Sequence, residues 1–242
     1  VSGNGDYNGD HIDDIILTAP AADVVDLVEA GVSYVVYGSA YGFSSEINLT
    51  TDLNGYNGFT INGVAGNDLT GEAVSNAGDI NGDGIDDLII GAPVADPDSD
   101  YDAGKSYVLF GNPNGFSSSF NLSGLDGSNG FTIEGAMTGD QLGISVSGAG
   151  DFNNDGIDDL IIGANWADPN ATDKAGISYI LYGKKDGFAS TLDLTTDLTV
   201  DIGTAINGED VEDNSAWTVS TAGDFNGDRI DDLIIGAGSA SP

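Results

Sequence analysis

The stretch Asp79-Ile-Asn-Gly-Asp-Gly-Ile-Asp-Asp-Leu-Ile-Ile90 joins an acidic segment to a run of large aliphatic side chains. Close copies of it begin at Asp6, Asp151 and Asp224, so successive starting points are 73, 72 and 73 residues apart. A pattern that returns at a fixed spacing along a whole chain is the signature of a repeat protein, in which each unit forms the same supersecondary structure. The sequence therefore predicts about three and a third repeats of about 73 residues.

Other landmarks keep the same register, among them Tyr34, Tyr107 and Tyr179. The predicted units are 1–65, 66–138, 139–212 and a partial unit at 213–242. Val1 aligns with Val74, inside the first strand of a unit, and the chain ends after the second strand of its last unit. We therefore expect the sequence to be a mature product or an excerpt of a longer array.

Each unit contains four short runs that are typical of strands and are bounded by turn residues. In the second unit these runs are Glu72–Ala77, Asp87–Ala92, Ser106–Phe110 and Phe131–Ile133. The Leu88-Ile-Ile90 run is apolar on both faces, as expected of a strand that is covered on both sides. The predicted class is all-β, and four strands per unit favour the blades of a β-propeller over a parallel β-helix, whose repeat is shorter.

The charge of the chain excludes several partners. It carries 40 acidic residues against 5 basic ones, a formal net charge of −35, and it has no cysteine. Such a surface repels nucleic acid and anionic membranes, and an absent thiol excludes cysteine metal sites and nucleophiles. Hydrophobic residues still make up 40% of the chain, enough for a core, but no apolar run has the length of a membrane span. We expect neither nucleic-acid binding nor membrane insertion.

The acidic segments carry the chemistry. Numbering the second loop from Asp79, side-chain oxygens stand at positions 1, 3 and 5 (Asp79, Asn81, Asp83), and Asp87 stands at position 9. Calcium takes about 6–8 oxygen ligands at about 2.3–2.6 Å in a flexible cage, and alternate residues of a tight loop point inward. The carbonyl oxygen of Ile85, at position 7, can complete the set. The pattern predicts one calcium ion per loop, hence about four ions.

An EF-hand is the first alternative for such a loop. It requires a carboxylate at about position 12 and a helix on either side. Here position 12 is Leu17, Ile90, Ile162 or Ile235, and the loop continues into a strand. The EF-hand interpretation is therefore rejected.

These residues closely resemble the FG-GAP repeat of integrin α-subunit propellers and their bacterial relatives. Phe110-Gly111 and Gly91-Ala92-Pro93 carry the two elements that name the family, and the other units keep partial versions of both. The resemblance implies a propeller, an extracellular or cell-surface setting, and a role in adhesion or matrix contact. It also implies that the calcium loops lie on one rim and brace the blades.

Carried over residue by residue, the resemblance implies four ligand sets. They are Asp6, Asn8, Asp10, Ile12 (carbonyl) and Asp14; Asp79, Asn81, Asp83, Ile85 and Asp87; Asp151, Asn153, Asp155, Ile157 and Asp159; and Asp224, Asn226, Asp228, Ile230 and Asp232. Position 6 is glycine in the second and third loops but His11 and Arg229 in the others, so we expect weaker calcium binding at the first and fourth sites.

Two further features outside the acidic loops are weaker indications of binding sites. Acidic residues alternate between Asp96 and Asp102 and suit an additional cation, although the other repeats lack this pattern and a solvated loop is the favoured interpretation. Trp166 and Trp217 suit a sugar-binding surface, with packing between blades as the favoured alternative.

The functional prediction is a non-enzymatic, calcium-binding structural or adhesive module. The one histidine lies inside a calcium loop and cysteine is absent, which excludes hydrolytic triads. The expected partners are other protein chains or further repeats of the same protein. A propeller lectin that binds surface glycans between blades is the alternative, and a carboxylate-based polysaccharide-active enzyme is a weaker one.

Overall fold

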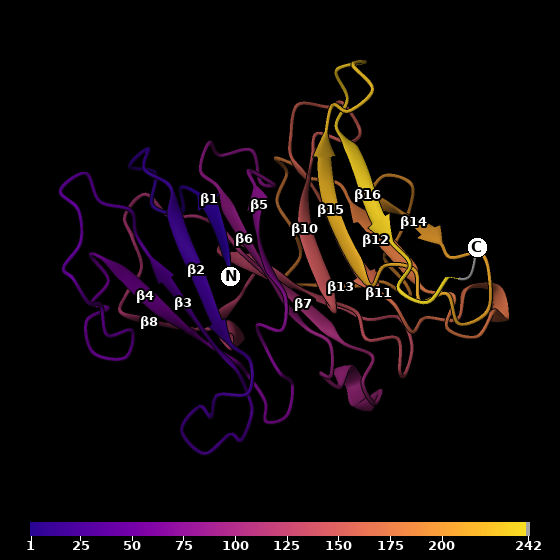
Figure 1. The fold of residues 1–242 in the computed structure, drawn as a ribbon, viewed down its shortest axis with the longest axis horizontal. Coiled ribbons are helices and arrows are strands. Elements are labelled where there is room, and N and C mark those ends of the chain that lie inside the picture. Colours follow the sequence, from indigo (N-terminus) through magenta and orange to yellow (C-terminus); the bar gives the residue numbers. More distant parts are fainter. Residues whose placement is uncertain (241–242) are drawn as a thin grey trace.

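A computed structural model describes residues 1–240, and these residues form a row of twisted antiparallel sheets (Figure 1). The strands of the first sheet are β1 (Ser2–Gly5), β2 (Asp14–Ala19), β3 (Val32–Val36) and β4 (Gly58–Asn62). Those of the second are β5 (Val74–Gly78), β6 (Asp87–Ala92), β7 (Lys105–Leu109) and β9 (Gly130–Glu134). Those of the third are β10 (Ser145–Gly150), β11 (Asp159–Ala164), β12 (Ile177–Leu181) and β14 (Gly203–Asn207), and the fourth contains β15 (Thr218–Gly223) and β16 (Asp232–Gly236).

Within each sheet the strands follow chain order from the inside outward, and each is antiparallel to the next. The inner strands β1, β5, β10 and β15 contact one another in succession, so the sheets stack face to face like the blades of a propeller. Over residues 1–240 the blades form an open row, with the first and fourth blades at its two ends (Figure 1). The predicted all-β class with four-stranded blades is confirmed.

The strands lie close to where the sequence predicts them. The run predicted at Asp87–Ala92 is β6, and the other three predicted runs of that unit overlap β5, β7 and β9. Short 3-10 turns at η1 (Pro97–Ser99), η2 (Leu122–Gly124) and η3 (Pro169–Ala171) are the helical elements among the described residues.

Two further strands were not predicted. β8 (Ser119–Asn121) pairs in parallel with β4 of the preceding unit, and β13 (Thr191–Asp193) pairs in parallel with β9. The second and the third unit therefore each contribute a fifth strand to the outer edge of the preceding blade. These connections cover an edge that would otherwise expose unpaired backbone groups, and they fasten consecutive units together.

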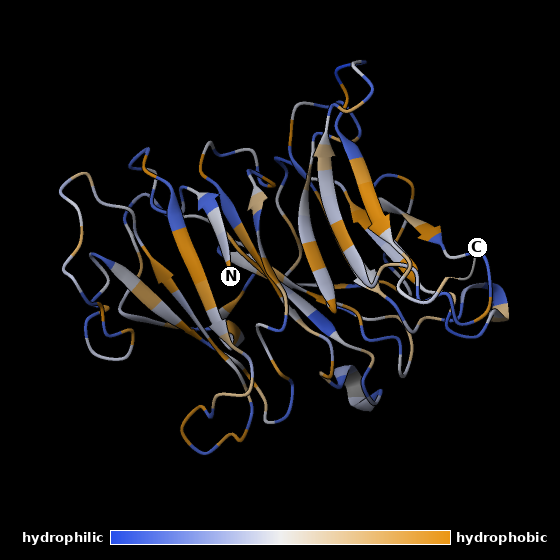
Figure 2. Cartoon of the chain, viewed as in Figure 1, coloured by the Kyte–Doolittle hydropathy of each residue, from blue (hydrophilic) through white to orange (hydrophobic). Residues whose placement is uncertain are grey.

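The core lies between the blades, and successive residues of one strand serve different interfaces. Leu88 and Ile90 pack against the first blade, in a cluster with Ile16 and Phe59, whereas Ile89 packs against the third blade, in a cluster with Leu160. Figure 2 shows the resulting hydrophobic bands along the central strands. The prediction that this run is covered on both faces is confirmed.

The same two faces are open at the ends of the row. Ile15, the counterpart of Leu88 in the first blade, is 47% exposed, and Ile234, the counterpart of Ile89 in the fourth, is 60% exposed. No helix in residues 1–240 has the length and apolar character needed to cross a membrane.

Candidate functional site: the four acidic loops

The four acidic loops connect the first and second strands of each blade, and all four project from the same edge of the row (Figure 1). Each loop leaves an inner strand through a bulge, where the pairing register shifts by one residue, and enters the buried second strand at its position-9 aspartate. The topology therefore places four copies of one acidic turn on one rim, the position that the family resemblance implies.

Inside each loop the side-chain oxygens at positions 1, 3 and 5 turn toward the backbone of the loop. In the second loop Asp79 Oδ1 and Asn81 Oδ1 both accept a hydrogen bond from the N–H of Asp83, at 2.8 and 2.9 Å. Asp83 Oδ1 in turn accepts from the N–H of Ile85 at 3.0 Å. The position-3 and position-5 bonds recur in the other three loops at 2.9 to 3.0 Å. These oxygens lie on the concave side of the turn.

Position 6 has a left-handed backbone in every loop, whether or not it is glycine. Gly84 and Gly156 have φ of 92° and 88°, and His11 and Arg229 have φ of 66° and 76°. The conformation aims the N–H of position 6 at the position-1 carboxylate, at 2.7 Å for His11 and 2.9 Å for Arg229. A side chain in this region costs about 1 kcal/mol relative to glycine. At position 6 the first and fourth loops therefore carry backbone strain that the second and third do not, while the third has a left-handed Asn154 (φ 59°) at position 4, where the other loops have glycine.

The position-9 aspartate is a buried acceptor that joins the loop to the third strand of its own blade. Asp87 is fully buried, and its carboxylate accepts from the N–H of Ile80 at 3.1 Å and from the N–H of Gly111 at 2.8 Å. Asp14 accepts the equivalent pair of bonds from the N–H groups of Tyr7 and Gly38. Asp159 accepts from the N–H of Gly183 and from that of Asn153, which stands one position further along its loop. A Cβ atom at Gly111 would lie 2.5 Å from the carbonyl oxygen of Asp86, which explains the glycine of the Phe-Gly pair.

The position-2 residue anchors the loop in the neighbouring blade, a role that the sequence analysis did not identify. Tyr7 and Ile80 are buried in the interface with the following blade, and the carbonyl oxygens of both accept an N–H from that blade. Phe225, at the same position of the fourth loop, is exposed. The alternation of polar and apolar residues at positions 1 to 3 is the signal that could have identified this anchor.

Burial and mutual repulsion raise the pKa of the position-9 carboxyls of the first three loops. The pKa of Asp87 rises to about 8, chiefly because of burial and further because of the charges of Asp83 and Asp79. Burial likewise raises the pKa of Asp14 to about 7 and that of Asp159 to about 6. A divalent cation would remove this repulsion, since each loop concentrates several negative charges beside an apolar strand.

The donor set of each loop fits calcium in its chemistry: three aspartates, one asparagine and one backbone carbonyl supply hard oxygen only. Over residues 1–240, however, no three Asp, Glu, His or Cys side chains meet in the arrangement of a metal site. The position-9 carboxylate is engaged by backbone N–H groups, and only positions 1, 3 and 5 converge on the turn. The four complete ligand sets remain a prediction.

The acidic loop on the opposite rim has a structural explanation. Asp96 Oδ1 accepts from the N–H of Asp102 at 2.8 Å, and the counterparts Asp23 and Asp168 accept from the residue six positions on, at 2.9 and 2.7 Å. The repeated bond closes a surface turn in each of the first three blades. It supports the favoured interpretation of this segment as a solvated loop.

A comparison with known protein families gives matches that recur along the chain, as the acidic loops do. The family model of the FG-GAP repeat matches residues 70–109, 142–181 and 215–241. The chain is therefore an FG-GAP repeat protein, as its motifs predict.

Its relatives fall into two groups. The chain is 31% identical over 199 residues to integrin alpha pat-2 of Caenorhabditis elegans, which covers 76% of this chain and 14% of the relative. It is 28% identical over 249 residues to integrin alpha pat-2 of Caenorhabditis briggsae, covering 96% of this chain and 17% of the relative. It is also 32% identical over 159 residues to the phosphatidylinositol-glycan-specific phospholipase D of Bos taurus, covering 66% of this chain and 17% of the relative. The chain spans less than a fifth of the length of each of these relatives.

Replacing the strained residue at position 6 should strengthen calcium binding. We expect His11→Gly and Arg229→Gly to raise the affinity of their own loops about fivefold, because about 1 kcal/mol of left-handed strain is removed. Site-resolved calcium titration of the two variants and the unmodified chain measures this. Gly84→Ala is the matched reverse change and should weaken the second loop. Equal affinities of all four loops in the unmodified chain would contradict the prediction.

Proposed function

We propose that this chain is a calcium-braced structural and adhesive repeat module that works outside the cell or on its surface. The observation that carries the proposal is the recurrence of one loop geometry four times on one rim, with oxygens of positions 3 and 5 facing the turn in every copy. In this role calcium would neutralise the carboxylates and fix each loop to the blade that it enters. The similarity to integrin α subunits supports a setting in which calcium is abundant and the partners are proteins or further repeats.

Counting bound calcium tests this proposal. The unmodified chain, dialysed against millimolar calcium, should hold about four ions as measured by metal analysis. Asp83→Ala removes the position-5 ligand of the second loop and should lower the count by one. Glu72, which is exposed and precedes β5 at the end away from the loop, is the control, and Glu72→Ala should leave the count unchanged. A chain without bound calcium would overturn the proposal.

We further propose that the module is not itself a catalyst. The phospholipase D relatives bear the name of an enzyme, but the chain covers only 17% of the bovine protein. Within residues 1–240 the clustered carboxylates at the four loops are engaged by backbone N–H groups, and the one histidine has a side chain that is almost fully exposed. Neither arrangement provides a general acid and base facing a common cleft.

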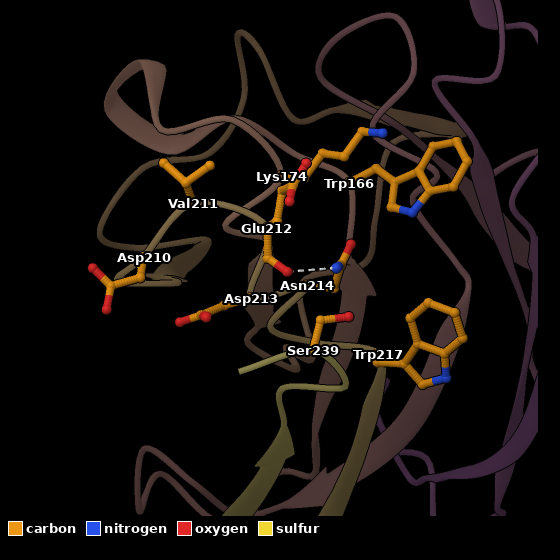
Figure 3. A pocket seen from close by; sticks show the side chains of 9 residues that line it. All are labelled: Trp166, Lys174, Asp210, Val211, Glu212, Asp213, Asn214, Trp217 and Ser239. Carbon is orange, nitrogen blue, oxygen red and sulfur yellow. Dashed lines mark hydrogen bonds between the residues drawn. The ribbon is translucent and has the colours of Figure 1, made fainter. Parts of the chain in front are cut away.

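Carbohydrate binding is a second candidate function, because the two tryptophans do not pack in the core. Trp166 and Trp217 are 39% and 51% exposed, which contradicts their favoured assignment to blade packing. Both line a cavity of about 500 Å³ between the third and fourth blades, on the rim opposite the calcium loops (Figure 3). Its other lining residues are Lys174, Asp210, Val211, Glu212, Asp213, Asn214 and Ser239. The Lys174 ammonium lies over the Trp166 ring, 4.6 Å from its centroid, so the Trp217 indole beside several hydrogen-bonding groups is the surface that suits the apolar face and hydroxyls of a sugar.

Tryptophan fluorescence can test this second function. Neutral oligosaccharides titrated into the unmodified chain should change the emission, and Trp217→Ala should weaken the binding at least tenfold, since truncating a tryptophan that carries a binding site costs about 2 kcal/mol or more. Tyr41 is fully exposed elsewhere, and Tyr41→Ala serves as the control. An emission that no oligosaccharide changes would contradict carbohydrate binding without affecting the calcium proposal.

A further inference from the structure

In the second, third and fourth loops the position-8 aspartate contacts the loop of the preceding blade. Asp86 Oδ2 accepts from the N–H of Asp6 at 3.0 Å, and Asp158 Oδ2 accepts from the N–H of Asp79 at 2.8 Å. Asp231 Oδ2 accepts from the N–H of Asp151 at 3.1 Å. We call Asp86, Asp158 and Asp231 the bridging aspartates. In every case the donor is the position-1 residue, whose carboxylate is a predicted calcium ligand.

The space for these bridges is made by glycine. A Cβ atom at Gly78 would lie 2.3 Å from Asp158 Oδ2, and a Cβ atom at Gly150 would lie 2.0 Å from Asp231 Oδ2. Both glycines immediately precede position 1 and have left-handed backbones, with φ of 69° and 64°. The residue before the loop is therefore a glycine with a left-handed backbone. Its missing side chain lets a carboxylate of the next blade reach the first N–H of the loop.

A second bond strengthens each connection. The carbonyl oxygen of Ile80, at position 2 of the second loop, accepts from the N–H of Lys184 at 2.9 Å. The carbonyl oxygen of Tyr7 accepts in the same way from Asn112 at 3.0 Å. Positions 1 and 2 of a loop are therefore held by two hydrogen bonds to the following blade. The acceptor of the first of these bonds directly precedes the position-9 aspartate of the next loop.

We propose that the bridging aspartates couple the calcium affinities of neighbouring loops. Calcium in one loop fixes its position-9 aspartate, and the adjacent bridging aspartate is then held where it orients position 1 of the preceding loop. The affinity of that loop rises because less conformational freedom is lost when its own ion binds. The bridging aspartates are positioning residues, since none of them is among the predicted ligands. This inference rests on the proposed calcium function.

A double-mutant cycle on the second and third loops tests the coupling. The amide signals of Gly84 and Gly156, one in each loop, report calcium binding site by site in NMR titrations of the full chain. Asp155→Ala disables the third loop. In the unmodified background it should lower the affinity of the second loop about fivefold or more, the usual size of such couplings. In the Asp158→Ala background the same change should alter that affinity less than about twofold.

Two control variants separate the bridge from a general loss of charge. Asp158→Asn keeps an oxygen that can accept the N–H of Asp79 and should restore the coupling. Asp13 is the position-8 residue of the first loop, is exposed, and makes no bridge among residues 1–240, so Asp13→Ala should leave the coupling intact. If calcium binds both loops but the coupling is absent or survives Asp158→Ala, the inference is overturned and the calcium function stands. If neither amide responds to calcium, both fail together.

Discussion

Removing calcium should lower the melting temperature of this chain by about 20 °C or more. An ion present at about a hundred times its dissociation constant stabilises the folded state by about 2.7 kcal/mol per site. For a chain of this length about 1 kcal/mol corresponds to about 2–4 °C, so four sites together exceed any other single contribution. Circular dichroism melts in excess calcium and in excess chelator, with bound metal counted in parallel, measure the effect.

Two controls separate ion binding from simple screening of the charge. The chain carries a formal −35, and any salt weakens the repulsion among surface carboxylates. Sodium chloride at matched ionic strength should recover only a small part of the shift. Magnesium should also recover little, because it requires near-ideal octahedral geometry and gives up its water reluctantly. A sodium chloride melt that equals the calcium melt would show that the loops are acidic turns and nothing more.

The repeat, the strand class and the covered central strands follow from the sequence because they depend on spacing and on side-chain polarity. The Leu88-Ile-Ile90 run has to be buried on both faces wherever the blades stack, and the structure places its residues in two different interfaces. The inward direction of positions 1, 3 and 5 is likewise local, since it follows from alternation along a tight turn. Local and periodic features are what a single sequence encodes most directly.

Features that join different units could not be predicted in this way. β8 and β13 are three residues long, and they pair with a strand of the preceding unit, so no pattern within their own unit indicates them. The bridging aspartates and the exposure of Trp166 and Trp217 depend on how one blade meets the next. The sequence shows that Asp158 recurs at its position, but only the arrangement of blades shows which N–H it meets.

Truncating a buried position-9 aspartate should have the largest effect of any single substitution. We expect Asp87→Ala to destabilise the calcium-loaded chain by about 3–5 kcal/mol. It leaves the N–H groups of Ile80 and Gly111 without an acceptor, at about 1–3 kcal/mol each, and it removes a predicted ligand as well. Denaturant unfolding in calcium and in chelator measures both contributions.

The matched control is Asp232→Ala, at the same position of the fourth loop. Asp232 is only half-buried, and its hydrogen bonds in the described part of the chain come from Asn226 alone. The substitution should therefore remove the fourth calcium ion and cost about 1 kcal/mol or less beyond it. Equal losses for the two variants would show that the position-9 carboxylate stabilises the fold through the ion only.

The loss in free energy of unfolding caused by Asp87→Ala should differ between calcium and chelator. Burial and the charges of Asp83 and Asp79 raise the pKa of Asp87 to about 8, so in chelator at neutral pH folding must protonate a carboxyl that is ionised in the unfolded chain, and alanine removes this cost. This relief offsets part of the cost of the two unpaired N–H groups. In calcium the ion already neutralises the carboxylates, so no relief is available and the full cost is measured. A loss that is larger in calcium than in chelator therefore identifies Asp87 as both a backbone acceptor and a calcium ligand, whereas equal losses leave it an acceptor alone.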